Sequence, residues 1–197
     1  MAIAHRYLYT YFRKCDVNYD EFNNMRKVLY RKRRKAFRRP PKTKSRAFKD
    51  LKEMADGNDD LVREVNGNVV LIARKEDLQL LSKDKLDLFA DGTFKFSPRL
   101  FKQVYTLLVF NEGFYVPVAH ILLQNKKVAT YKKALKTFEK VCKEHNISIR
   151  KCLNEKQVTI MIDFESAMIK ALKSWSKNLK IQGCKCHLGQ SWWRKIK

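Results

Sequence analysis

The sequence predicts an α/β domain with a mixed sheet, built in the order β-β-β-α-β-α-β. Short runs of apolar and aromatic residues, separated by turn residues, occupy 86–123 and are typical of three consecutive strands. The stretch 128–142 has apolar residues at spacings of three and four, which predicts a long amphipathic helix. The run 158–162 is almost wholly apolar, as expected of a strand that is buried on both faces and paired in parallel.

Several shorter elements are expected before this core. Residues 47–55 place apolar side chains on one face of a short helix. The segments 61–65 and 69–73 flank the sequence Asn-Gly-Asn at 66–68, which is a strong signal for a β-hairpin. Residues 76–81 are expected to form a second short helix.

The core elements follow in an order that is typical of one fold. The sequence predicts strands at 86–94, 104–110 and 115–123, a helix at 128–142, a strand at 158–162, a helix after Asp163, a strand at 179–183 and a helix at 190–197. This order resembles the ribonuclease H-like fold, in which the first and fourth core strands lie side by side. Asp91 and Asp163 are 72 positions apart (163 − 91), yet in that fold they are expected to meet.

The charge of the chain predicts a polyanionic partner. The 197 residues carry a formal net charge of +23, and their pI is near 9.9. Hydrophobic residues make up 45% of the chain, which is enough for a folded core and argues against a disordered basic tail. Such an excess of Lys and Arg is typical of nucleic-acid-binding proteins; a basic surface of the ribosomal-protein kind is the other interpretation.

Nothing in the sequence predicts secretion or membrane insertion. The first residues lack the apolar stretch of a signal peptide, and no window approaches about 18 consecutive apolar residues. The five cysteines are odd in number and scattered, so we expect reduced thiols in an intracellular protein. With nucleic acid as its partner, such a protein is expected in the nucleus.

A strongly basic segment dominates the N-terminal region, 1–60, which precedes the domain expected at 61–197. Thirteen Lys or Arg and no acidic residue occur between Arg26 and Lys49. Because Pro40 and Pro41 break helices and like charges repel, we expect an extended, partly disordered arm. The arm would bind DNA phosphates or act as a nuclear-import signal, with a solvated linker as the other interpretation. The residues predicted to bind nucleic acid are Arg31, Lys32, Arg33, Arg34, Lys35, Arg38, Arg39, Arg194 and Lys195.

Two aspartates at the ends of apolar runs are the candidate catalytic and metal-binding residues. Asp91 precedes a glycine and has turn formation as its other interpretation, and Asp163 has helix N-capping. On neighbouring strands, however, two carboxylates can hold the divalent cations that drive in-line attack on a phosphodiester. Glu165 is expected on a helix, two positions beyond Asp163 and pointing away from it, so it is not included in the site.

Cys184 and His187 form a Cys-x-x-His pair whose spacing fits half of a zinc site, with Cys186 as a possible substitute ligand. A buried cysteine beside a histidine at a helix start is the other interpretation. Trp192 and Trp193 next to basic residues can stack on bases, although a packed amphipathic helix is the commoner explanation for such a pair.

Four segments together resemble the transposase domain of Mutator-like elements (MULE), over roughly residue 61 to the C-terminus. They are 89–95, 115–119, 161–165 and 183–195. The resemblance implies a ribonuclease H-like core with a DDE acid triad, Mg²⁺ or Mn²⁺ as cofactor, DNA as substrate and action as a homo-oligomer. By this resemblance Asp91 and Asp163 are the first two acids, and Cys184 and His187 are the family's Cys-x-x-His element.

The chain departs from the family pattern at the third acid. That residue is a Glu well downstream of the Cys-x-x-His element, and no residue of this sequence corresponds to it. We therefore expect a ribonuclease H-like domain that is incomplete at its C-terminal side and does not complete DNA cleavage by itself. The alternative function is a non-catalytic DNA-binding protein derived from a transposase, and a ribonuclease acting on RNA–DNA hybrids is a third possibility.

Overall fold

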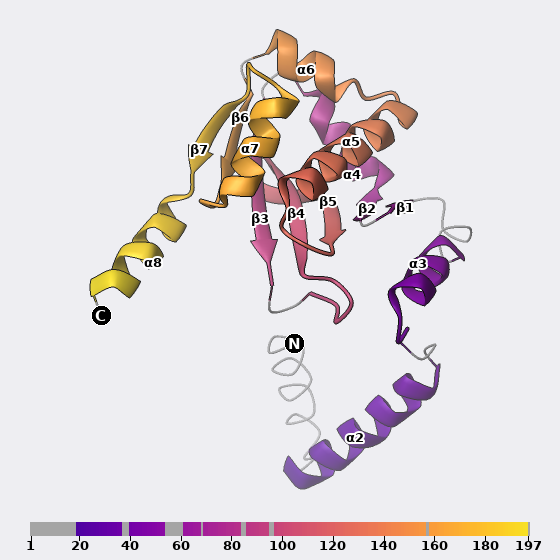
Figure 1. The fold of residues 1–197 in the computed structure, drawn as a ribbon. Coiled ribbons are helices and arrows are strands. Elements are labelled where there is room, and N and C mark those ends of the chain that lie inside the picture. Colours follow the sequence, from indigo (N-terminus) through magenta and orange to yellow (C-terminus); the bar gives the residue numbers. More distant parts are fainter. Residues whose placement is uncertain are drawn as a thin grey trace. The chain divides into compact units, whose positions relative to one another are not determined.

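The computed structural model describes residues 19–36, 40–53, 61–67, 69–83, 86–94, 97–156 and 158–196 (Figure 1). The chain divides into two compact units, Met1–Pro41 and Lys42–Lys197. In the described part of the chain, no helix is both long enough and apolar enough to cross a membrane.

The described part of the first unit is dominated by helix α2, Tyr19–Ala36. The expectation of an extended arm was therefore wrong for Arg31 to Lys35, which lie in the last turns of this helix. Asp20 and Glu21 in its first turn and basic residues in its last turn stabilise it through the helix dipole, and Lys and Arg are good helix formers. The two prolines come after the helix and do not interrupt it. Arg38 and Arg39 lie outside the described residues.

The second unit contains one open mixed sheet, which confirms the α/β class. Within the described residues the sheet has seven strands in the order β1-β2-β5-β4-β3-β6-β7. The strands are β1 (Leu61–Asn66), β2 (Val69–Arg74), β3 (Asp87–Thr93), β4 (Gln103–Asn111), β5 (Phe114–Leu123), β6 (Thr159–Ile162) and β7 (Lys180–Gly183). All neighbours from β1 to β3 are antiparallel, whereas β3–β6 and β6–β7 are parallel. The expected pairing of the strands that precede Asp91 and Asp163 is thus confirmed.

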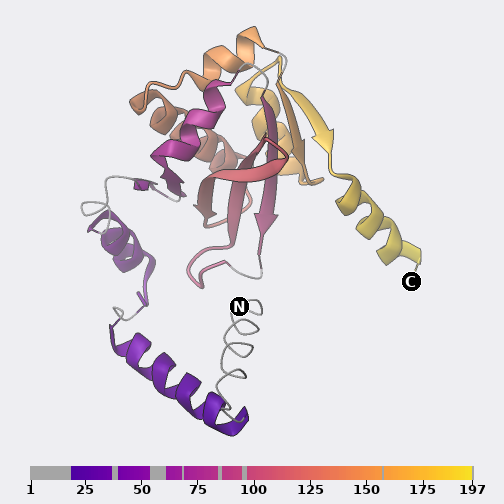
Figure 2. The same ribbon diagram turned by 180° about the vertical axis from the view of Figure 1, so that it is seen from behind.

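The helices of this unit are α3 (Lys44–Glu53), α4 (Lys75–Gln79), the 3-10 turn η2 (Leu80–Ser82), α5 (Val128–Glu144), α6 (Ile149–Glu155), α7 (Ser166–Trp175) and α8 (Lys185–Ile196). Helices α5 and α7 contact each other and cover the same face of the sheet (Figures 1 and 2). Helix α6 has no counterpart among the sequence-based predictions, because its seven residues bury only Ile149 and Leu153.

The core lies between the sheet and helices α5 and α7. Burial alternates along β3, so that Leu88 and Ala90 point into the core while Phe89 and Asp91 do not. Tyr105 of β4 and Phe138 of α5 are among the large side chains buried there. Burial on alternate residues is the geometry expected of a strand with one face toward the core.

The C-terminal helix differs from the expectation at its start. Helix α8 begins at Lys185, five residues before the position expected from the sequence. Cys186 and His187 therefore lie in its first turn, and Cys184 directly precedes it. None of the residues of α8 is buried, so an apolar stripe could not reveal its start.

Candidate metal and nucleic-acid site

The parallel pairing of β3 with β6 brings Asp91 and Asp163 to the same level of the sheet. The recorded register ends at Phe89 opposite Met161, an offset of 72 residues (161 − 89). Asp91 and Asp163 have the same offset (163 − 91), two residues further along. Extended by two residues, this register puts the two aspartates at one level, with Asp163 directly after the end of β6.

Asp91 lies inside β3, opposite Thr106 of β4, and so does not form an Asp-Gly turn. About half of its side chain is exposed, at 50%. The next residue, Gly92, faces the core, where a Cβ atom would lie 3.3 Å from atoms of Gln103 and Tyr105. The glycine therefore lets two buried side chains pack against the strand directly beside the acid.

Asp163 and Glu165 both precede helix α7. The helix begins at Ser166, and its N-cap is Glu165 in an extended conformation. The carboxylate of Asp163 accepts a hydrogen bond of 3.2 Å from the backbone N–H of Glu165, so it caps a turn before the helix and does not cap the helix itself. The expectation that Glu165 lies within a helix, which was the reason for leaving it out of the site, was therefore wrong.

Cys184 lies beside the two acids because β7 pairs with β6. Its backbone N–H donates to the carbonyl of Ile162, the residue before Asp163, at 2.8 Å. Extending the register of β6 and β7 by one residue places Cys184 opposite Asp163. The three adjacent strand ends thus carry Asp91, Asp163 and Cys184 at one level.

His187 completes this group from the first turn of α8. Its Nε2 lies 3.7 Å from Oδ1 of Asp91. Hydrogen bonding to Cys184 raises the pKa of His187 above its ordinary value, and the charges of Asp91 and Asp163 add to the effect. Conversely, the backbone N–H of His187 is the main cause of the lowered pKa of Cys184. The structure thus places Asp91 and Cys184 beside His187, with Asp163 within electrostatic range of the same imidazole.

A buried tyrosine links the acids to the core. Tyr105 is 1% exposed, and burial raises its pKa well above 10.0. The negative charges of Asp163, Glu165 and Asp91 raise this pKa further, so all three carboxylates lie within electrostatic range of one hydroxyl group. Sequence reasoning did not identify Tyr105 because its position in β4 marks it only as a core residue.

Two further polar side chains extend this buried region. The amide of Gln103 donates a hydrogen bond to the hydroxyl of Tyr131, and both residues are buried. Burial raises the pKa of Tyr131, and interaction with the Glu165 carboxylate raises it further. Glu165 is thus connected to α5 through its carboxylate and to the Asp163 carboxylate through its own backbone N–H.

Lys126 is a basic residue of the site that sequence reasoning missed. It lies in the loop between β5 and α5, and its Nζ is 3.5 Å from Oε1 of Glu165. The same ammonium lies 3.7 Å from the centre of the Phe94 ring. Phe94 follows β3 directly, so Lys126 contacts both segments that carry the acids.

The donor set is suited to hard cations near the aspartates and only partly to zinc. Half-exposed carboxylate oxygens are ligands that Mg²⁺ and Mn²⁺ prefer. Within the described residues, no group of three or more His, Cys, Asp or Glu side chains is arranged to hold a metal ion. Cys184 and His187 would therefore supply two ligands of a zinc site, and a closed tetrahedral site needs four.

Those predicted nucleic-acid-binding residues that the structure describes lie on two helices. Arg31 to Lys35 are exposed near the end of α2, in the first unit. Arg194 and Lys195 are exposed in the last turn of α8, next to Trp192 and Trp193, which are 60% and 62% exposed. Both helices present positive charge to solvent, and α8 also presents aromatic rings.

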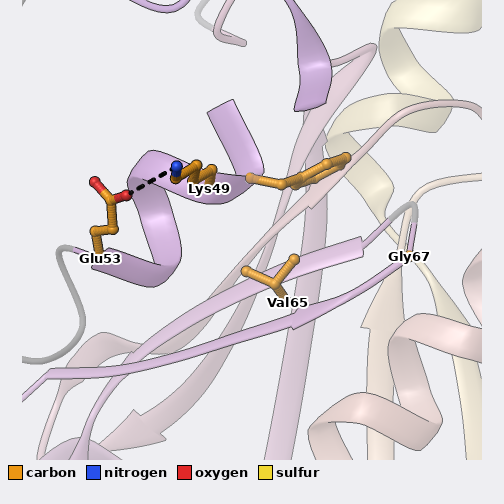
Figure 3. Close-up of a pocket in the computed structure, with 5 residues that line it drawn as sticks. Lys49, Glu53, Val65 and Gly67 are labelled. Carbon is orange, nitrogen blue, oxygen red and sulfur yellow. Dashed lines mark ion pairs between the residues drawn. The ribbon is translucent and has the colours of Figure 1, made fainter. Parts of the chain in front are cut away.

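A separate surface pocket of about 490 Å³ lies between α3 and the β1–β2 hairpin (Figure 3). Phe48, Val65 and Gly67 line it, together with Lys49 and Glu53, whose charged groups are 3.9 Å apart. It shares no residue with the acid site.

Comparison of the chain with protein-family models, with curated proteins and with solved structures gives no match. The site therefore has to be interpreted from its own geometry.

Proposed function

We propose that the chain is a DNA-binding protein derived from a transposase, with a ribonuclease H-like domain that holds Mg²⁺ or Mn²⁺ between Asp91 and Asp163. The observation that supports the proposal is the parallel β3–β6 pair, whose register, when extended by two residues, aligns Asp91 with Asp163. The strand order β5-β4-β3-β6-β7, antiparallel in its first three strands and parallel in the last two, supports the ribonuclease H-like assignment.

The proposed chemistry is attack on a DNA phosphodiester. Bound divalent ions polarise the phosphate and activate the attacking hydroxyl group or water. The chain's own residues would hold the ions through Asp91 and Asp163, and the turn at Glu165 N–H would orient the second carboxylate. His187 would keep its ring against Asp91, and with Cys184 it would contribute to a Zn²⁺ site beside the acids.

The basic helices would bind the DNA backbone. Phosphate contacts made by Arg31 to Lys35 on α2 and by Arg194 and Lys195 on α8 need no particular base sequence. Arg38 and Arg39 are proposed to contribute in the same way. DNA as partner implies a nuclear location, and action at two DNA ends implies a homo-oligomer.

The test of the metal site is Mn²⁺ binding, measured by electron paramagnetic resonance, together with Mn²⁺-dependent nicking of supercoiled plasmid. We expect Asp91→Asn and Asp163→Asn to abolish Mn²⁺ binding and any nicking. Asp87→Asn is the matched control, since Asp87 lies on the same face of β3 four residues earlier and is paired with Thr159. Equal Mn²⁺ binding by all four proteins would refute the proposed site.

A second candidate function is DNA binding without strand cleavage. The charge of α2 favours it, because Arg31 to Lys35 can bind phosphates independently of the acid site. Here Asp91→Asn and Asp163→Asn would leave DNA affinity and all other activity unchanged, and replacement of Arg31 to Lys35 by Gln would abolish binding. Metal-dependent nicking by the native chain would exclude this alternative.

A further inference from the structure

Lys126 is held between the two segments that carry the candidate acids. Phe94 comes three residues after Asp91, and Glu165 comes two residues after Asp163. Both contact the same ammonium group, the carboxylate at 3.5 Å and the ring centre at 3.7 Å. The ammonium group of Lys126 therefore contacts the segment that follows Asp91 and the segment that follows Asp163.

The two partners restrict where the ammonium can lie. Glu165 is 13% exposed, so its carboxylate is held by the surrounding protein, and the Phe94 ring attracts the cation through its face. The side chain of Lys126 is itself 38% exposed. An ammonium group has three N–H donors, so a half-exposed lysine held on one side by a carboxylate can still donate to a ligand from solvent.

Glu165 is in turn held by the core. Its interaction with Tyr131 contributes to the raised pKa of that hydroxyl, and Tyr131 accepts a hydrogen bond from Gln103. Its backbone N–H donates to the Asp163 carboxylate. The position of the Lys126 ammonium is therefore set by the same residue that orients the second acid.

We propose that Lys126 binds a phosphate oxygen of the DNA strand whose phosphodiester lies at Asp91 and Asp163, and that Glu165 and Phe94 position it. This inference rests on the proposed function, and it adds the residue that contacts the substrate. Two carboxylates near a phosphodiester repel it, and a fixed cation beside them offsets that repulsion. A half-exposed ion pair adds little stability by itself, so loss of the Lys126–Glu165 pair should leave the fold intact. If Lys126 had only a structural role, its replacement would therefore leave DNA affinity unchanged.

The test is the affinity of the full chain for a short DNA duplex of mixed sequence, measured by fluorescence anisotropy over a range of salt concentrations. We expect Lys126→Gln to weaken binding about fivefold at low salt and to reduce the salt slope by about one counterion. Lys126→Arg should retain most of the affinity. Lys127→Gln is the matched control, because it removes the same charge from the adjacent, exposed residue.

A second measurement prevents α2 from masking the effect. The comparison is repeated in a chain whose Arg31, Lys32, Arg33, Arg34 and Lys35 are replaced by Gln. If Lys126→Gln and Lys127→Gln then have the same affinity and the same salt slope, Lys126 does not contact phosphate. Folding is checked by thermal unfolding, and equal melting temperatures assign any loss of affinity to the contact.

Failure of this inference is distinguishable from failure of the proposed function. If the native chain binds Mn²⁺ and the Asp163→Asn variant does not, the proposed metal site is supported, whatever the effect of replacing Lys126. If the native chain binds no Mn²⁺ but Lys126→Gln specifically weakens DNA binding, the phosphate contact stands and the metal site is refuted. Equal affinities for the Lys126 and Lys127 variants in both backgrounds would overturn the phosphate contact.

Discussion

Replacing Tyr105 by Phe tests the polar region beneath the acids. The side chain of Tyr105 is 1% exposed, and its hydroxyl has no hydrogen-bond partner among the described residues. A buried hydroxyl without a partner costs about 1–3 kcal/mol. Tyr105→Phe removes that cost and keeps the ring, so we expect the free energy of unfolding to rise by about 1 kcal/mol or more, and the melting temperature to rise by about 2–4 °C per kcal/mol.

The assay is urea unfolding followed by circular dichroism, with thermal unfolding as a second measure. The matched control is Tyr131→Phe, which leaves the buried Gln103 amide without its hydroxyl acceptor and should therefore destabilise by about 1–2 kcal/mol. A change in midpoint with an unchanged denaturant slope assigns the effect to the native state. If Tyr105→Phe is clearly less stable than the native chain, the hydroxyl makes an interaction that the geometry does not contain.

The same residue predicts how stability changes in alkali. The folded-state pKa of Tyr105 is raised well above 10.0 by burial, whereas in the unfolded chain it returns to about that value. Above pH 10.0 the unfolded state therefore loses a proton that the folded state keeps, and stability falls as pH rises. Tyr105→Phe should make this decline shallower, and an unchanged decline would contradict the assignment.

Three further predictions concern the surroundings of the site. Gly92→Ala adds a Cβ atom 3.3 Å from buried side chains of β4, so it should lower the free energy of unfolding in urea by about 1–3 kcal/mol. Asp91→Asn removes one of the charges that add to the effect of Cys184 on His187, so the pKa of that imidazole should fall in an NMR titration. Iodoacetamide should modify Cys184, whose pKa is lowered by the His187 backbone N–H, well before Cys142, whose pKa is raised to about 12 by burial.

Each of these has a result that would contradict it. An Ala variant at position 92 with unchanged stability would mean that the neighbouring side chains can move aside. An unchanged His187 titration in the Asp91 variant would place the two groups further apart in solution than the 3.7 Å found here. Alkylation of Cys142 at the rate of Cys184, measured by peptide mass spectrometry of the folded chain, would show that Cys142 is not buried.

The sequence by itself determined the elements whose pattern is local. The apolar runs of β3 and β6 and the Asn-Gly turn between β1 and β2 are each visible within about ten residues, because strand propensity and turn chemistry depend on near neighbours. The order of these elements was sufficient to predict that β3 and β6 are adjacent. Asp91 within β3 and Asp163 directly after β6 were therefore identified before their spatial relation was known.

Predictions from local sequence pattern were wrong for a highly charged helix and for the positions at which two helices begin. Arg31 to Lys35 suggested repulsion and an extended chain, whereas the helix dipole and the acidic first turn of α2 favour a helix. The start of α8 was placed too late because none of its residues is buried. Glu165 was assigned to a helix because it follows a strand, and only the backbone conformation places it at the N-cap.

Tertiary structure alone decided which side chains surround the acids. Lys126 and Glu165 are 39 residues apart (165 − 126), and Lys126 and Phe94 are 32 apart (126 − 94), so no local pattern connects them. The unpartnered hydroxyl of Tyr105 likewise depends on the pairing of β4 with β3 and on the packing of its ring against Tyr131 of α5. Such contacts are set by the folding of distant segments onto one sheet, whereas strand identity is set by the alternation of neighbouring side chains.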